Sequence, residues 1–130
     1  MRRLRQCGPR PERGAAAVEF AVILPVVVAL ALGIFEFGRG YFTKIELTGA
    51  VREGARVLAL GQDPGDAQAR VTDASPGLDP GQFSFSGIQT CPSGTDGVGS
   101  ITASYPYSYN VFFFSGSTNI SVTGSMRCGV

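Results

Sequence analysis

The sequence predicts an α+β protein in which one long N-terminal helix crosses a membrane and carries a small C-terminal antiparallel β-sheet on its outer half. Three observations predict this fold: residues 15–35 are apolar, helical spacing of apolar residues continues over 36–61, and apolar and polar residues alternate after residue 83. A chain of 130 residues has room for one domain. We therefore expect the helix and the sheet to share a core.

The composition excludes several classes of enzyme. The chain has no His, which removes imidazole zinc sites, Ser-His-Asp and Cys-His nucleophile systems and His general bases. The sequence shows no phosphate-binding glycine loop, no paired catalytic carboxylates and no cluster of metal ligands. A net charge of +1 gives no field that attracts nucleic acid. We expect a non-enzymatic protein without cofactor, metal site or nucleic-acid partner.

Residues 15–35 are long and apolar enough to cross a bilayer. At ~1.5 Å per helical residue they span ~30 Å, the thickness of the hydrocarbon core, and their single ionisable group is Glu19. Five of the eleven basic residues precede them: Arg2, Arg3, Arg5, Arg10 and Arg13. The positive-inside rule then places the N-terminus in the cytoplasm and residues after 35 outside the cytoplasmic membrane. A buried helix of a soluble protein is disfavoured, because such a helix rarely lacks a polar face.

The helical pattern continues outside the membrane over residues 36–61. Small or apolar residues recur there at helical spacing: Leu47, Ala50, Val51, Gly54 and Leu58. One helix is therefore expected from Ala15 to about Leu60. Glu53 and Arg56 are three residues apart and are expected to pair on a solvated or docking face.

Residues 62–82 are expected to form a linker with a short helix at 67–74, and residues 83–130 a β-rich region. Gly61 and Pro64 are typical of a helix end. Apolar residues then alternate with polar ones at Phe83, Phe85, Ile101, Ala103, Tyr105, Ile120, Val122, Gly124 and Met126. This period predicts strands with one buried face, which we expect on the outer half of the helix because so small a sheet is unstable alone.

The run Val111–Phe114 is the other conspicuous apolar feature. We expect it to fold over the helix as part of the core. The alternative is a contact patch for a partner or for the bilayer surface.

The start of the chain resembles a prepilin processing site. A basic leader at residues 1–14 ends in Gly14, and a hydrophobic helix follows from Ala15 with Glu19 at its fifth position and Phe20 after it. Residues 36–61 then resemble the helix of TadE-like proteins, minor pilins or pseudopilins of the tight-adherence, or Flp-type, pilus. The residues that fit the family pattern are Glu36, Phe37, Gly38, Arg39, Tyr41, Phe42, Leu47, Ala50, Arg52, Glu53, Gly54, Ala55 and Arg56.

The resemblance also reaches the C-terminal strands. Residues 101–107 are similar to the family strand that closes in Tyr-Pro-Tyr, and 125–127 to its final strand, whereas 62–95 resemble it least. Gly49 stands where the family more often has Asn, and Val51 where Ala is common. We expect both departures to alter the helix surface and partner specificity, not processing.

The resemblance implies a structural subunit of the cytoplasmic membrane, or of the pilus itself, that acts in pilus assembly for surface attachment. A prepilin peptidase would cleave between Gly14 and Ala15, and Glu19, followed by Phe20, would then meet the new amino terminus of a neighbouring subunit. The implied partners are that peptidase, other pilin or pseudopilin subunits, the pilus assembly platform in the membrane, and the lipid bilayer. Electrostatics supports this implied cleavage. A free amino group neutralises a nearby carboxylate, whereas a charged leader is excluded from an apolar interface.

The cysteine count predicts a disulfide in the exported region. Cys7 lies in the leader and would leave with it, so Cys91 and Cys128 remain as a pair. Their disulfide would close a loop of ~40 residues and contribute roughly 3–4 kcal/mol. Two free buried thiols are the alternative.

Two other fates of the N-terminal segment stay open. Signal peptidase prefers the small-x-small form found at residues 29–31, and a cut after Ala31 would release a secreted binding domain. In the second alternative the segment is not cleaved and anchors the protein in the membrane as a single span. Cleavage before Ala15 is favoured, because a cut after Ala31 separates two halves of a helix whose pattern continues.

Overall fold

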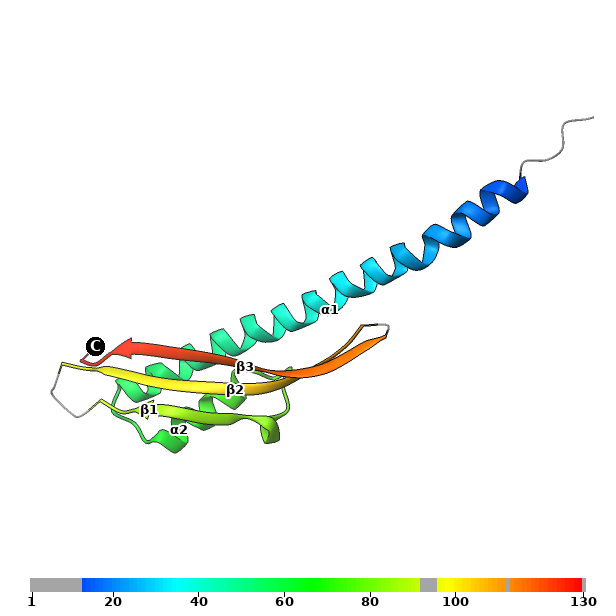
Figure 1. Cartoon of the computed structure of the whole chain (residues 1–130). Coiled ribbons are helices and arrows are strands. Elements are labelled where there is room, and N and C mark those ends of the chain that lie inside the picture. The colour runs from blue at the N-terminus through cyan, green and yellow to red at the C-terminus, as the bar shows by residue number, and fades with distance from the viewer. Residues whose placement is uncertain (1–12, 92–95, 112, 130) are drawn as a thin grey trace, which may run out of the picture.

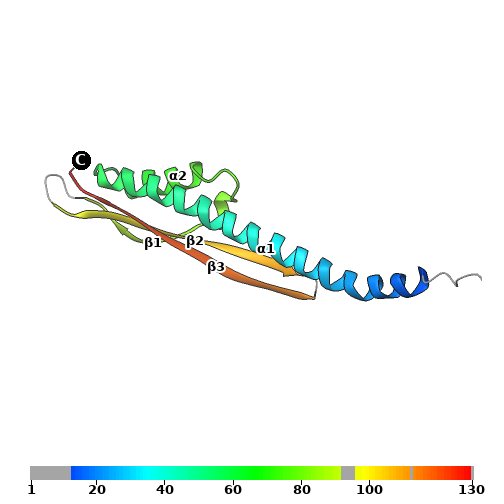
Figure 2. The same ribbon diagram turned by 90° about the horizontal axis from the view of Figure 1, so that it is seen from above.

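The computed structural model describes residues 13–91, 96–111 and 113–129 and confirms the predicted α+β fold. The elements follow in the order α1 (Arg13–Ala59), α2 (Pro64–Asp73), a 3-10 turn (Pro80–Gln82), β1 (Ser84–Gln89), β2 (Val98–Val111) and β3 (Phe114–Arg127). The N-terminal part of α1 projects far beyond the sheet, and α2 lies beside its C-terminal part (Figures 1 and 2). Residues 1–12 of the predicted leader, including Cys7, lie outside the described residues.

Helix α1 is a single element of 47 residues that runs through Pro25. A proline inside a helix removes one backbone hydrogen bond, which membrane helices tolerate. The apolar segment and the helical pattern that follows it therefore form one continuous helix, as the sequence predicted.

The sheet within the described residues has the strand order β1-β2-β3 and is antiparallel throughout. Strands β2 and β3 pair in unbroken register from Val98↔Arg127 to Val111↔Phe114, and this long hairpin runs along α1 toward its N-terminal half (Figures 1 and 2). The shorter β1 pairs with the part of β2 that lies farther from the hairpin end.

The core lies between the outer half of α1, α2 and one face of the sheet. Leu47, Val51 and Leu58 are fully buried there, and the whole predicted stripe is buried. The sheet contributes Ile101 and Ala103 to this core, and α2 contributes Ala67 and Val71. The alternation of apolar residues thus predicted the buried face of β2 correctly.

Val51 corrects one expectation. The departure from the family pattern at this position was expected to affect the helix surface, but the Val51 side chain is 0% exposed. Gly124 of β3 lies so close to it that an added Cβ would collide with the Val51 carbonyl oxygen. The side chain at position 51 is therefore part of the buried core and not of the helix surface.

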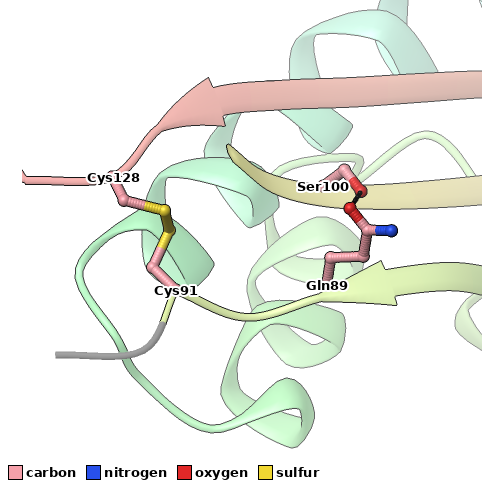
Figure 3. Close-up of a disulfide and its surroundings, with 4 residues drawn as sticks. All are labelled: Gln89, Cys91, Ser100 and Cys128. Carbon is pink, nitrogen blue, oxygen red and sulfur yellow. Dashed lines mark hydrogen bonds between the residues drawn. A yellow bond between two sulfur atoms is a disulfide. The ribbon is translucent and has the colours of Figure 1, made fainter. Parts of the chain in front are cut away.

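Two local features close the outer end of the domain. Helix α2 begins at Pro64, three residues earlier than expected, because the Asp63 side chain caps it by accepting the Gly65 N–H at 2.8 Å and proline suits the first helical turn. Cys91 and Cys128 form the predicted disulfide, with a Cα–Cα distance of 5.6 Å, which ties the segment after β1 to the end of β3 (Figure 3).

Candidate functional site

The N-terminal half of α1 is an apolar rod that the rest of the described chain leaves largely exposed. The helix contains an 18-residue window of mean hydropathy 2.6, none of which is buried. Its large apolar side chains are exposed, among them Val18, Phe20, Val22, Ile23, Val26, Val27, Leu30 and Ile34. A core helix would be covered by its own domain, so this segment suggests a membrane anchor.

The four residues predicted to act in processing and assembly lie at the start of this rod. Gly14 and Ala15 are exposed in the first turn of α1, whose N–H groups have no intrahelical partner, so local opening there costs little. Glu19 is also exposed, and among the described residues it forms no hydrogen bond or ion pair. Phe20 beside it is 64% exposed. An acid in an apolar rod normally has a partner, and the described residues supply none to Glu19.

A second acid, Glu36, lies where the predicted membrane segment ends, and it is 8% exposed. The Tyr107 hydroxyl donates to Glu36 Oε1 at 2.8 Å and lies 3.1 Å from the Glu36 carbonyl oxygen. Arg39 Nη1 forms an ion pair with Glu36 Oε2 at 3.1 Å. We call these three residues the junction cluster; it joins β2 to α1 at the end of the predicted membrane segment.

Tyr107 is shielded on the side that faces α1. A Cβ added at Gly40 would lie 3.3 Å from the Tyr107 ring, so the absence of a side chain at this helix position admits the ring. Burial raises the pKa of the Tyr107 phenol above its ordinary value of 10.0, and the hydrogen bond and negative charge of Glu36 raise it further. The phenol therefore stays a donor to Glu36 at neutral pH.

Sequence reasoning missed the junction cluster. Glu36 and Tyr107 were recognised as parts of the family pattern, but the two residues are 71 positions apart and nothing in their spacing connects them. The available signal was the location of Glu36 at the end of an apolar span, because an acid there needs a partner.

An apolar groove of about 640 Å³ lies between α1 and the β2–β3 hairpin, next to the junction cluster. From α1 it is lined by Gly33, Phe37 and Tyr41, and from the hairpin by Tyr109, Val111 and Ile120 among others. The hairpin thus lies alongside the helix at this level, with the space between them open.

The expectation that Val111–Phe114 folds over the helix is wrong for its described residues. Phe113 and Phe114 are 84% and 76% exposed, and Val111 is partly buried. The physical reason is that β2 and β3 stay paired as far as Val111↔Phe114, beyond the junction cluster. These two residues therefore lie past the domain core. The alternative, a contact patch, stays a prediction.

The expected pairing of Glu53 with Arg56 is also not formed. Both side chains are exposed, and in the part of the chain that the structure describes the one ion pair within 4.0 Å joins Arg39 to Glu36. Glu53 and Arg56 instead line a polar surface groove with Asp66, Arg70 and Asp73 of α2. No group of three or more potential metal ligands occurs among the described residues.

In the part of the chain that the structure describes, the fold is α+β with one exposed apolar helix, of the kind that anchors a protein in a membrane. Within this class, the model of the TadE-like protein family matches residues 14–56, which contain Glu19, Phe20 and Glu36, and this match confirms the predicted resemblance over that range. No curated protein and no solved structure matches the chain.

Proposed function

We propose that this chain is a minor pilin or pseudopilin that a prepilin peptidase processes and that acts in the assembly of a tight-adherence pilus for surface attachment. The TadE-like match at residues 14–56 implies a structural protein associated with such a pilus. The observation that carries the proposal is the exposed apolar rod with one acid, Glu19, near its end and without a partner in the described chain.

Cleavage between Gly14 and Ala15 changes what the rod can bind. The precursor carries a basic leader that holds it in the membrane with its N-terminus in the cytoplasm. Removal of the leader frees an amino group on Ala15. Glu19 of a neighbouring subunit then forms an ion pair with this amino group. The two charges neutralise each other in an apolar interface, where burying either charge alone would cost free energy.

The outer domain is positioned by the same rod. Because α1 is continuous and its outer half is buried against the sheet and α2, any movement of the membrane segment carries the whole domain with it. We propose that other pilin or pseudopilin subunits contact the exposed sides of the rod, and that the assembly platform draws the subunit from the cytoplasmic membrane. The role is structural and not catalytic.

The test is to replace Glu19 in the producing cell. Glu19→Gln keeps the side-chain shape but cannot neutralise an amino group, so we expect loss of pili by electron microscopy and of surface attachment, at an unchanged membrane level of the protein. Glu53→Gln is the matched control, since this exposed glutamate lies on the outer half of α1. Normal pili on cells with Glu19→Gln would contradict the proposal.

A further inference from the structure

We propose that the end of the β2–β3 hairpin is a second membrane contact, in which Val111, Phe113 and Phe114 enter the outer leaflet of the bilayer beside α1. This inference rests on the proposed anchoring of α1 in the membrane. It assigns a role to an apolar run whose described residues are not part of the buried core.

The depth of the hairpin end follows from its contacts with α1. Tyr107 is bonded to Glu36, the first residue after the predicted span of 15–35. From Tyr107 strand β2 continues toward the N-terminal half of α1 (Figures 1 and 2), and four further residues advance it by ~13 Å. Val111 and Gly33 line the same groove. Because Gly33 lies inside the predicted span, the hairpin end reaches the depth of the outer leaflet.

The chemistry of the hairpin suits this location. No Asp, Glu, Lys or Arg occurs between Val98 and Met126, although much of this segment is exposed. Ionisable side chains are costly at membrane depth, and their absence over such a length is unusual for a solvated surface. Phe113 and Phe114 instead offer large apolar surfaces at the far end of the hairpin.

Aromatic residues of α1 lie just outside the predicted span, at the level of Tyr107. Phe37, Tyr41 and Phe42 are each more than half exposed within the two turns that follow the predicted span. Aromatic side chains concentrate at the boundary between acyl chains and headgroups. The apolar groove between these residues and the hairpin is then in contact with lipid and not with water.

Backbone hydrogen bonding limits how deep the hairpin goes. The outer edges of the β2–β3 pair near its end are not covered by β1, which pairs only with residues 100–104 of β2. Open strand edges are not tolerated in the hydrocarbon centre. The aromatic rings therefore enter the boundary between headgroups and acyl chains, while the strand edges keep access to water.

The absence of tryptophan from the chain makes a direct test possible. Phe114→Trp places a single fluorophore at the hairpin end, Val26→Trp places one in the middle of the span, and Leu60→Trp places one at the far end of α1, all at exposed side chains. Each full-length variant is reconstituted at one copy per phosphatidylcholine nanodisc. Fluorescence quenching is then measured with lipids brominated near the headgroup or near the acyl end.

We expect the fluorescence of the Phe114→Trp variant to be blue-shifted and to be quenched most by bromine near the headgroup, whereas the Val26→Trp variant is quenched most by bromine near the acyl end. The Leu60→Trp variant should be unquenched. Phe113→Trp repeats the measurement at the neighbouring position, and retention of the disulfide and the near-UV spectrum shows that each variant is folded.

Three outcomes overturn the inference, and they are distinguishable. Quenching of Phe114→Trp no stronger than that of Leu60→Trp, with Val26→Trp quenched, rejects the hairpin contact and leaves the anchor intact. Absence of quenching in Val26→Trp rejects the anchor, and with it the proposed function. A blue-shifted Phe114→Trp that brominated lipid does not quench, seen only in discs that hold two copies, assigns the hairpin end to a second chain.

Discussion

The two halves of α1 belong to one unbroken helix and have opposite surroundings. In residues 14–35 every apolar side chain except that of Ala29 is exposed, and Leu30 is 64% exposed, whereas in residues 36–59 a narrow stripe is buried, in which Leu47 is 0% exposed. A helix that is apolar all round needs a membrane or other subunits, and a helix with one apolar stripe needs its own domain. The sequence pattern of each half therefore indicates what kind of surroundings its side chains need.

Two acids of the helix, Glu19 and Glu36, differ in the same way. Glu36 is buried and is paired with Tyr107 and Arg39, so its charge is compensated within the chain. Glu19 is exposed in the apolar half and has no partner among the described residues. Glu36 therefore serves the fold, and we propose that Glu19 serves assembly.

The largest expected effect on the outer half comes from removing the disulfide. The change Cys91→Ser/Cys128→Ser frees a loop with a sequence separation of 37 residues. We expect the free energy of unfolding of the outer domain to fall by about 4 kcal/mol, as loop closure entropy predicts. Urea unfolding of the full chain in detergent, followed by near-UV circular dichroism, measures this change. A simultaneous loss of helicity in residues 14–35 would contradict the proposed difference between the two halves of α1.

A matched pair of leucines tests the distinction more directly. Leu58→Ala opens a cavity in the core and should cost about 3 kcal/mol of unfolding free energy in the same experiment. Leu30→Ala removes the same atoms from an exposed position and should leave the outer domain unchanged. Equal losses from the two substitutions would show that the apolar half contributes to the core after all.

The smallest expected effect concerns the junction cluster and its pH dependence. Tyr107→Phe removes the hydrogen bond to Glu36 and should cost about 1 kcal/mol of unfolding free energy at neutral pH. Because the folded state raises the pKa of Tyr107, its contribution is complete below pH 10.0 and is lost as the pH rises through the raised pKa. The difference in stability between wild type and Tyr107→Phe should therefore shrink above pH 10.0. A difference that stays constant with pH would contradict the assignment.

What the sequence predicted depended on local periodicity. The stripe through Leu47 and Leu58, the buried face of β2 at Ile101 and Ala103, and the Cys91–Cys128 pair follow from spacing, counting and alternation. These features are local, or are limited to few alternatives by the number of cysteines.

What the sequence did not predict depended on contacts between distant segments. The bond from Tyr107 to Glu36 requires the register of β2 on α1, which no local pattern specifies. The apolar character of Phe113 and Phe114 was clear, but hydrophobicity alone does not distinguish a core from a membrane-facing surface. Only the length of the β2–β3 pairing shows on which side of the junction cluster these residues fall.

The most direct test of the central proposal is the intact mass and N-terminal sequence of the protein isolated from its producing cell. Our account predicts a mature chain that begins at Ala15, with Glu19 as its fifth residue. A chain that begins at Leu32 would identify a secreted domain released by signal peptidase, and one that retains Met1 an uncleaved anchor. Either result would contradict processing by a prepilin peptidase.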